Sequence, residues 1–168
     1  LIVTREWGPV MLWKNDQGRR LVDDTQYSGL GAWTGWWNGV ASADLDRDGD
    51  FDSVVPNFGL NTKYHASADK PALLYYGDFE GQGRASLVEA EHENTVLYPV
   101  RGKSCSTRAM PFLGEKFTTY SDFARATLGE IYTPECLSEA QRFAANTLES
   151  GILINDGQGR FSFQPLPR

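Results

Sequence analysis

The stretch 44–52 reads Asp-Leu-Asp-Arg-Asp-Gly-Asp-Phe-Asp and decides how the chain is interpreted. Carboxylates alternate with other residues around a single glycine, Gly49. In water each close pair of carboxylates repels by about 1 kcal/mol, so a folded turn that gathers them needs a cation. Ca²⁺ prefers oxygen ligands and suits this pattern. We predict a calcium loop whose ligands are the side chains of Asp44, Asp46, Asp48 and Asp52 and the main chain of Asp50.

The residues around this loop predict strands and not the helices of an EF-hand. An EF-hand needs a glutamate at the twelfth position, which is occupied here by Val55. Residues 39–43 and 51–56 are short apolar runs bounded by Gly and Pro, which is the pattern of strands. We therefore expect the loop to connect two strands.

Residues 38–55, which read Asn-Gly-Val-Ala-Ser-Ala-Asp-Leu-Asp-Arg-Asp-Gly-Asp-Phe-Asp-Ser-Val-Val, resemble an FG-GAP (VCBS-type) repeat. Such repeats are the β-propeller blades of integrin α heads and of many bacterial envelope proteins. The continuation 56–64, Pro-Asn-Phe-Gly-Leu-Asn-Thr-Lys-Tyr, resembles the bacterial branch whose members carry a UnbV-type domain. The resemblance implies that the aspartates of the loop bind Ca²⁺ on one face of a propeller. It also implies an extracellular, periplasmic or cell-surface protein.

A second, weaker version of the loop follows in the sequence. It begins at Asp78, and its remaining candidate ligands are Glu80 and Gln82. A neutral glutamine stands at the fifth position and Ser86 at the ninth, so the formal charge falls from four carboxylates to two. Affinity for calcium should fall with it. We expect this loop to bind calcium weakly or to be a purely structural turn.

Two further segments, 11–22 and 152–163, each place an Asn-Asp turn with glycine after an apolar strand. Both predict hairpins, and stacked repeats of such units favour a propeller. The predicted fold is all-β: a partial β-propeller of two to three blades of antiparallel strands with a short helical insertion. Because residue 1 falls within an apparent strand, we expect residues 1–168 to be a fragment of one β-propeller domain.

The helical insertion is predicted over residues 117–146. Thr119 with Asp122 three residues later predicts one helix start, and Thr133 before Pro134 predicts a second helix that runs to about Ala145. This segment would cover a sheet edge or act as a binding lid.

Of the two cysteines, Cys105 precedes this segment and Cys136 lies within it. A disulfide between them would close a loop of about 30 residues and contribute about 3 to 4 kcal/mol in the chain-entropy model. Two free thiols are the alternative, and the sequence leaves both open.

The aromatic residues are expected to pack in the interior. Trp33, Trp36 and Trp37 directly precede a strand, so we interpret them as fillers between blades and not as a sugar-binding surface. Tyr64, Tyr75 and Tyr76 are interpreted in the same way.

Composition and charge exclude several functions. The net charge of −6 argues against nucleic-acid binding, which requires clustered Lys and Arg. No apolar run approaches the roughly 20 residues of a membrane span. The two histidines, His65 and His92, have no catalytic or zinc-binding pattern around them, and His92 is expected in a hairpin turn with Glu91 and Glu93.

The sequence therefore predicts a calcium-binding module without enzymatic activity. Its role would be that of a binding or scaffold domain in an exported or envelope protein, with an unknown protein or carbohydrate ligand. The isolated piece is expected to self-associate, because a propeller cut open exposes strand edges. The alternative is that the chain is part of a propeller-type carbohydrate-active enzyme, a polysaccharide lyase or hydrolase.

Overall fold

The computed structural model describes residues 1–167, and the chain divides into two compact units. Unit 1 comprises residues 1–69 and the chain from Ala144 onward, and unit 2 comprises residues 70–143. Antiparallel sheets dominate, with 34% strand against 19% helix, so the expectation of a mainly β protein is confirmed at this level. None of the sheets of the described residues closes into a barrel, and the propeller stays a prediction.

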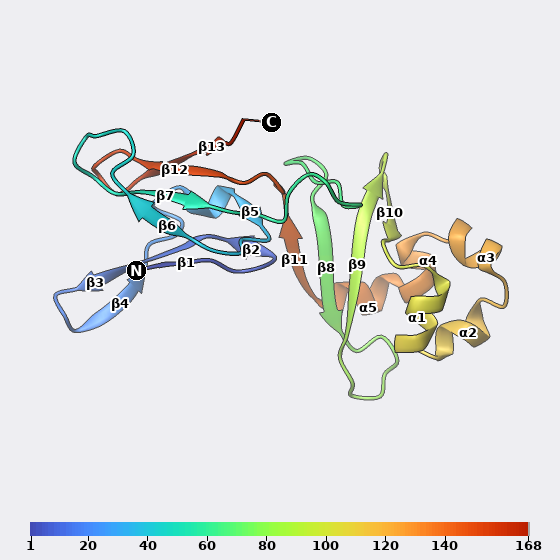
Figure 1. The fold of residues 1–168 in the computed structure, drawn as a ribbon. Helices are drawn as coiled ribbons and strands as arrows, with labels where there is room; N and C mark the ends of the chain where they lie inside the picture. Colours follow the sequence, from blue (N-terminus) through green and yellow to red (C-terminus); the bar gives the residue numbers. More distant parts are fainter. Residues whose placement is uncertain (168) are drawn as a thin grey trace. The chain divides into compact units, whose positions relative to one another are not determined.

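Unit 1 is built from short strands and one 3₁₀ helix (Figure 1). These elements are β1 (Ile2–Val3), β2 (Gly8–Pro9), β3 (Met11–Asp16), β4 (Arg20–Asp23), η1 (Leu30–Ala32), β5 (Thr34–Gly35), β6 (Ala41–Ala43), β7 (Asp52–Val55), β12 (Gly151–Asn155) and β13 (Phe161–Pro165). The β3–β4 and β12–β13 pairs are the two hairpins that the sequence predicts, and both are confirmed.

A four-stranded sheet in the order β13-β12-β7-β6 is the centre of unit 1. Each neighbouring pair is antiparallel, so the four strands form a meander. Residues 56–150 interrupt this meander between β7 and β12, as the colours of Figure 1 make clear, with the cyan β7 beside the orange β12. The sheet is therefore completed by two parts of the chain that lie far apart in the sequence.

Apolar side chains from β3, from the four-stranded sheet, from η1 and from the segments between them form the core of unit 1. Trp37 is its largest member, and its ring lies 5.7 Å from that of Phe163 in an edge-on arrangement. The buried cluster consists of Val10, Leu12, Leu30, Trp37, Val55, Leu153 and Phe163. Because Leu153 and Phe163 come from the segment after residue 150, that segment is part of the core and not an appendage.

Unit 2 contains a second sheet, in the order β10-β9-β8-β11, and the last strand of this sheet runs two residues past the boundary of the unit. Its strands are β8 (Ala72–Gly77), β9 (Ser86–Glu93), β10 (Val96–Pro99) and β11 (Gln141–Ala145). Three consecutive strands with the fourth beside the first is the spatial order of a Greek key. The turn predicted at Glu91–Glu93 lies about two residues later in the structure. β9 continues to Glu93, and the turn uses Asn94, which adopts φ of 57°. Asparagine tolerates this left-handed conformation better than most residues.

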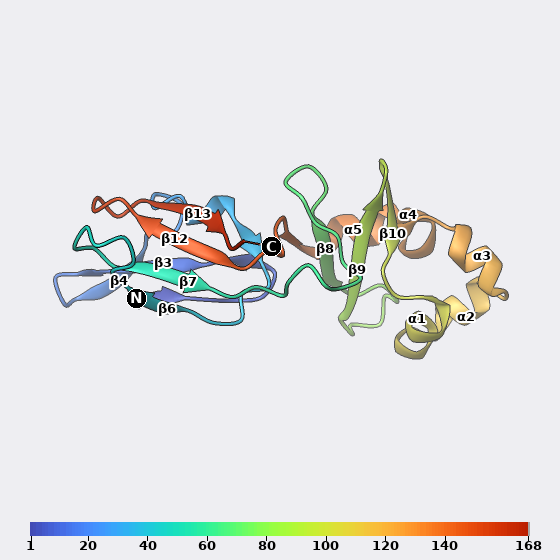
Figure 2. The same ribbon diagram turned by 45° about the horizontal axis from the view of Figure 1, so that its top comes forward.

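Five short helices lie beside this sheet in both views (Figures 1 and 2). They are α1 (Lys103–Ala109), α2 (Phe112–Lys116), α3 (Tyr120–Arg125), α4 (Leu128–Tyr132) and α5 (Pro134–Glu139). α4 contacts β10 and α5 contacts β8. Leu113, Phe123 and Ile131 are buried, so each of three helices contributes an apolar side chain to the interior of unit 2.

The predicted helix starts are confirmed, but the predicted extent of the helical segment, 117–146, is not. Thr119 accepts a hydrogen bond from the amide of Asp122 at 3.1 Å, and Thr133 caps α5 ahead of Pro134. The first helix begins earlier, at Lys103. The prediction missed it because the residue before α1 is Gly102, which has no side chain to signal a helix cap in the sequence. The last helix ends at Glu139, since Ala140 takes an extended backbone and β11 follows.

The close packing of Gly151 in the β12–β13 hairpin can be tested by substitution. A Cβ atom added at Gly151 would lie 2.6 Å from the carbonyl oxygen of Gln164 and even closer to the ring of Phe163. We expect Gly151→Ala to lower the free energy of unfolding by about 1 to 3 kcal/mol, measured by urea denaturation. Gly39→Ala is the matched control, because its nearest neighbour would be Pro56 Cγ at 3.6 Å, and it should change stability by no more than about 0.5 kcal/mol. Equal stability of the two variants would contradict this packing.

Candidate metal centre

The predicted calcium loop connects β6 to β7, as expected. Asp52 pairs with Ala43 in the register of the two strands, so residues 44–51 form the whole connection. Gly49 adopts φ of 99°, a conformation that residues with a Cβ rarely take, and Arg47 also has a positive φ, of 68°. The chain therefore turns sharply at two positions within the loop, one on each side of Asp48.

Three of the predicted ligands lie together. Oxygen atoms from the side chains of Asp44, Asp46 and Asp48 are all within 4.8 Å of one another, and all three residues are exposed. Backbone amides of the loop hold them: the amide of Asp48 donates to Asp46 Oδ1 at 3.2 Å, and that of Asp50 donates to Asp48 Oδ1 at 2.9 Å. The amide of Gly49 donates to Asp44 Oδ2 at 3.3 Å. The carboxylates are therefore oriented by the fold itself.

The electrostatics of the cluster favour a bound cation. Partial desolvation raises the pKa of Asp46 above its ordinary value, and the neighbouring carboxylates of Asp48 and Asp52 raise it further. A raised pKa means that the ionised form is disfavoured in the fold. The donors are hard anionic oxygens, which fit Ca²⁺ and not a soft transition metal.

Asp52 occupies a different position from these three residues. Its side chain is fully buried, and it is not part of the group within 4.8 Å. Its Oδ2 accepts a hydrogen bond from the amide of Leu45 at 3.0 Å, and its Oδ1 accepts one from the amide of Asn155 at 2.9 Å. Asp52 thus joins the loop to the β12–β13 turn.

The side chain of Asp50 also faces the β12–β13 turn. A Cβ atom at Gly157 would lie 2.6 Å from Asp50 Oδ2, so the absence of a side chain there makes room for this carboxylate. In addition, Asn155 Nδ2 donates to the carbonyl oxygen of Phe51 at 3.4 Å. Sequence reasoning interpreted Asn155 only as a turn residue and missed this role. Its pairing with a residue 103 positions away left no local signal.

The second loop, after β8, is organised differently. Asp78 Oδ1 accepts hydrogen bonds from the amides of Glu80 at 3.0 Å and Gly81 at 2.9 Å, while its Oδ2 accepts one from the amide of Gly83. These amides, led by that of Gly83, lower the pKa of Asp78. Backbone dipoles already balance this carboxylate. Only two carboxylates, those of Asp78 and Glu80, are present among the predicted ligands of this loop.

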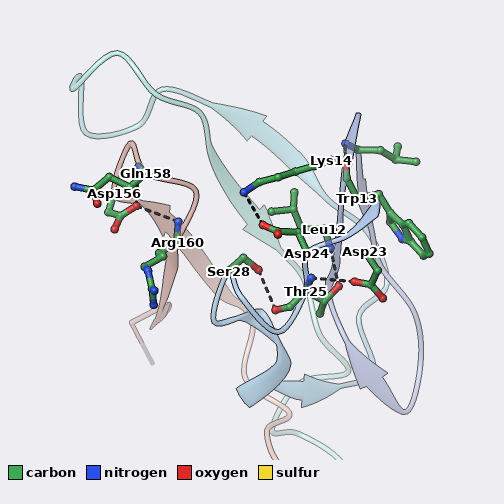
Figure 3. A network of polar contacts seen from close by, with 11 residues as sticks. Leu12, Trp13, Lys14, Asp23, Asp24, Thr25, Ser28, Asp156, Gln158 and Arg160 are labelled. Carbon is green, nitrogen blue, oxygen red and sulfur yellow. Dashed lines mark hydrogen bonds and ion pairs between the residues drawn. The ribbon is translucent and has the colours of Figure 1, made fainter. Parts of the chain in front are cut away.

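The turn between β12 and β13 uses the same device (Figure 3). Asp156 Oδ1 accepts hydrogen bonds from the amides of Gln158 at 2.9 Å and Arg160 at 3.0 Å. The amide of Arg160 is the main cause of the lowered pKa of Asp156. Nearby, Lys14 Nζ lies 2.6 Å from Asp24 Oδ2 in the same view, so charged groups in this part of unit 1 are locally balanced.

The expectation that aromatic residues pack in the interior is confirmed for most of them. Trp36 and Trp37 are 6% and 2% exposed, and Tyr75 is buried. Trp36 contacts Tyr64 with ring centroids 4.7 Å apart. Two residues differ, because Trp33 is 36% exposed and Tyr76 is 45% exposed. Trp33 still contacts the core, since its ring lies 5.0 Å from that of Phe163.

Two further features of the chain bear on its chemistry. Cys105 and Cys136 are both free thiols in this structure. In residues 1–167 no helix has the length and apolar character that crossing a bilayer requires.

Comparisons of the chain with protein-family models, with curated proteins and with solved structures found no match. The resemblance to FG-GAP repeats therefore rests on the residues of the chain itself.

The lowered pKa of Asp156 predicts how the stability of the β12–β13 turn depends on pH. Because the folded-state pKa lies below the ordinary value of 3.8, the stabilising contribution is fully present above that value and is lost as the pH falls through the folded-state pKa. Asp156→Ala should lower the melting temperature at neutral pH, and the difference from the unmodified chain should narrow below about pH 4. Thermal denaturation at a series of pH values measures this.

Asp156→Asn is the control for charge, because it retains an oxygen acceptor and removes the ionisable group. Its melting temperature should lie between those of the other two proteins at neutral pH. A gap between Asp156→Ala and the unmodified chain that stays constant down to pH 2 contradicts the assignment.

Proposed function

We propose that the chain is a calcium-binding repeat module that serves as a binding or scaffold domain. The observation that carries this proposal is the convergence of Asp44, Asp46 and Asp48, whose oxygens lie within 4.8 Å of one another on a loop turned by Gly49. Amide hydrogen bonds fix these carboxylates in place, although their mutual repulsion opposes the arrangement. Calcium would relieve that repulsion and add coordination bonds.

The proposed role of calcium is to hold together the four-stranded sheet of unit 1. The loop is joined to the β12–β13 turn through the buried carboxylate of Asp52, which accepts from the amides of Leu45 and Asn155. A loop made rigid by calcium would keep Asp52 in position for both hydrogen bonds. The ion would therefore stabilise the contact between β7 and β12, which residues 56–150 separate in the sequence.

We propose further that this sheet is a blade of FG-GAP type. Blades of propellers are four-stranded sheets, and β6, β7, β12 and β13 form a four-stranded antiparallel meander. The predicted metal loop connects the first two strands of this meander. The resemblance of residues 38–55 to FG-GAP repeats and the strand order therefore support the same assignment.

The proposed calcium site favours an exported protein. Extracellular calcium modules bind with dissociation constants of about 10⁻⁴ to 10⁻³ M, which the cytosolic calcium concentration would not saturate. A module of this kind would be filled outside the cell or in the envelope and would present its surface to a protein or carbohydrate ligand there.

Calcium should raise the melting temperature of the protein. With a dissociation constant in the extracellular range, about 10 mM calcium would add about 1.4 to 2.7 kcal/mol to the free energy of unfolding. Asp46→Ala and Asp48→Ala should each remove most of this calcium-dependent increment. The increment is the difference between melting in calcium and in chelator for the same variant, so a general effect of the substitution on folding cancels.

Asp69→Ala is the matched control, because Asp69 is an exposed acidic residue of unit 1 outside the loop. It should retain the full increment. Titration calorimetry should detect one site, since the carboxylate of Asp78 already accepts hydrogen bonds from backbone amides and its loop has only two predicted carboxylate ligands. Identical melting curves in calcium and in chelator would exclude the calcium proposal. Two equally tight sites would show that the Asp78 loop also binds calcium tightly.

Calcium should also protect the amide of Asn155 from hydrogen exchange. This amide donates to Asp52 and not to a ladder partner, so its protection reports the joint between the loop and the β12–β13 turn. Exchange measured by NMR should slow when calcium is added. The amide of Phe117, which donates to Leu113 in unit 2, is the internal reference and should not change. Equal protection of the Asn155 amide with and without calcium would mean that calcium binding does not affect the hydrogen bond between Asn155 and Asp52.

A further inference from the structure

A cavity of about 340 Å³ lies within unit 2, between β10 and helices α1 and α3. Its volume falls within the range of about 300 to 1,000 Å³ that is usual for small-molecule sites. All its lining residues belong to residues 93–126, so the cavity is contained in one unit. The calcium loop lies in the other unit, and the metal proposal does not account for this cavity.

The lining combines aromatic surface with charge. Phe123, which is 3% exposed, and Ala126 provide an apolar floor, and Tyr98 and Tyr120 contribute rings and hydroxyl groups. Such a surface suits a ligand with a flat, ring-shaped body. The hydroxyl groups suit a ligand that also carries polar substituents.

Tyr120 is held in position although it is exposed. Its side chain is 69% exposed, yet its hydroxyl group forms a hydrogen bond of 3.0 Å with Ser104 Oγ. On the ring, Lys103 Nζ lies 5.4 Å from the centroid, in a cation–π contact. Two residues at the start of α1 therefore restrain a tyrosine of α3.

The charges of the cavity favour an anionic ligand. Lys103 forms no ion pair in the described part of the chain, so its ammonium group is available to a ligand. Arg101 is bonded to Glu89, with Nε 2.8 Å from Oε2, and this pair fixes the guanidinium beside the cavity. Glu93 is the acidic residue of the lining and can accept hydrogen bonds from hydroxyl groups.

We propose that this cavity binds a sugar acid, with the carboxylate at Lys103, the ring against Tyr98 and Tyr120, and a hydroxyl group at Glu93. A plain aromatic acid fits less well, because it has no hydroxyl group to donate to the carboxylate of Glu93. A neutral sugar would leave Lys103 without an anion. The proposal extends the binding role of the module, and it does not depend on calcium occupying the loop.

The test is an NMR titration of ¹⁵N-labelled protein in calcium-containing buffer with three probes. Glucuronate carries both the ring and the carboxylate, glucose carries the ring alone, and acetate carries the carboxylate alone. Glucuronate should bind saturably and shift the amides of residues 98–103 and 120–126. Glucose and acetate should each bind at least about tenfold more weakly, because each lacks one of the charged or stacking contacts.

Variants of Lys103 and Tyr120 complete the experiment. Lys103→Gln and Tyr120→Ala should each weaken glucuronate binding by about tenfold or more, since each removes a main contact. Lys63→Gln is the matched control, because Lys63 Nζ lies 5.2 Å from the ring of Tyr64 in a similar cation–π contact in unit 1. It should leave binding unchanged.

Three results would overturn the proposal. They are equal binding of glucose and glucuronate, unchanged binding in Lys103→Gln, and shifts that spread over both units without saturation. The amide spectrum of each variant shows whether it is folded, so a loss of binding in a folded variant is attributable to the cavity. The calcium increment in melting temperature is measured separately, and either proposal can therefore fail while the other stands.

Discussion

The buried carboxylate of Asp52 is the constraint on which unit 1 depends. A carboxylate removed from water is strongly unfavourable unless hydrogen bonds replace its hydration. Asp52 obtains these bonds from the amides of Leu45 and Asn155, which belong to segments on either side of the long interruption of the sheet. The loop between β6 and β7, the β12–β13 turn and the register of β7 against β12 all meet at this one side chain. Displacing either segment would leave a buried charge without its partner.

Three turns of this protein show two ways of holding an aspartate in a tight loop. Asp78 and Asp156 are surrounded by backbone amides, and the pKa of each is lowered. Asp46 also accepts an amide hydrogen bond, but it is partly desolvated and lies beside other carboxylates, and its pKa is raised. The difference follows from composition, since the first loop has Asp48 and Asp52 where the Asp78 loop has the neutral Gln82 and Ser86. Loops of similar spacing therefore differ in how far the main chain balances their carboxylates.

Local patterns in the sequence were sufficient to predict part of this structure. The loop between two strands, both terminal hairpins and the caps at Thr119 and Thr133 depend on residues a few positions apart, and all were predicted. The features that were missed depend on partners far apart in the sequence or on residues whose type does not indicate a structure. α1 follows Gly102, which gives no capping signal, and Arg142 to Ala144 join a sheet although their composition is compatible with a helix. The bond from Asn155 to Asp52 spans 103 positions and has no sequence signature.

The insertion of residues 56–150 into a sheet has a consequence for the order of folding. Bringing β7 to β12 closes a loop of about 95 residues, for which a flexible chain would lose about 4 kcal/mol of entropy. In unit 2, β8 and β11 are neighbours, and Gly77 at the end of β8 lies against Ala140 just before β11. Once unit 2 has formed, most of that loop is already closed, and the effective separation of β7 and β12 becomes short. During synthesis from the N-terminus, the first half of the unit 1 sheet must therefore wait for the second while the inserted unit folds between them.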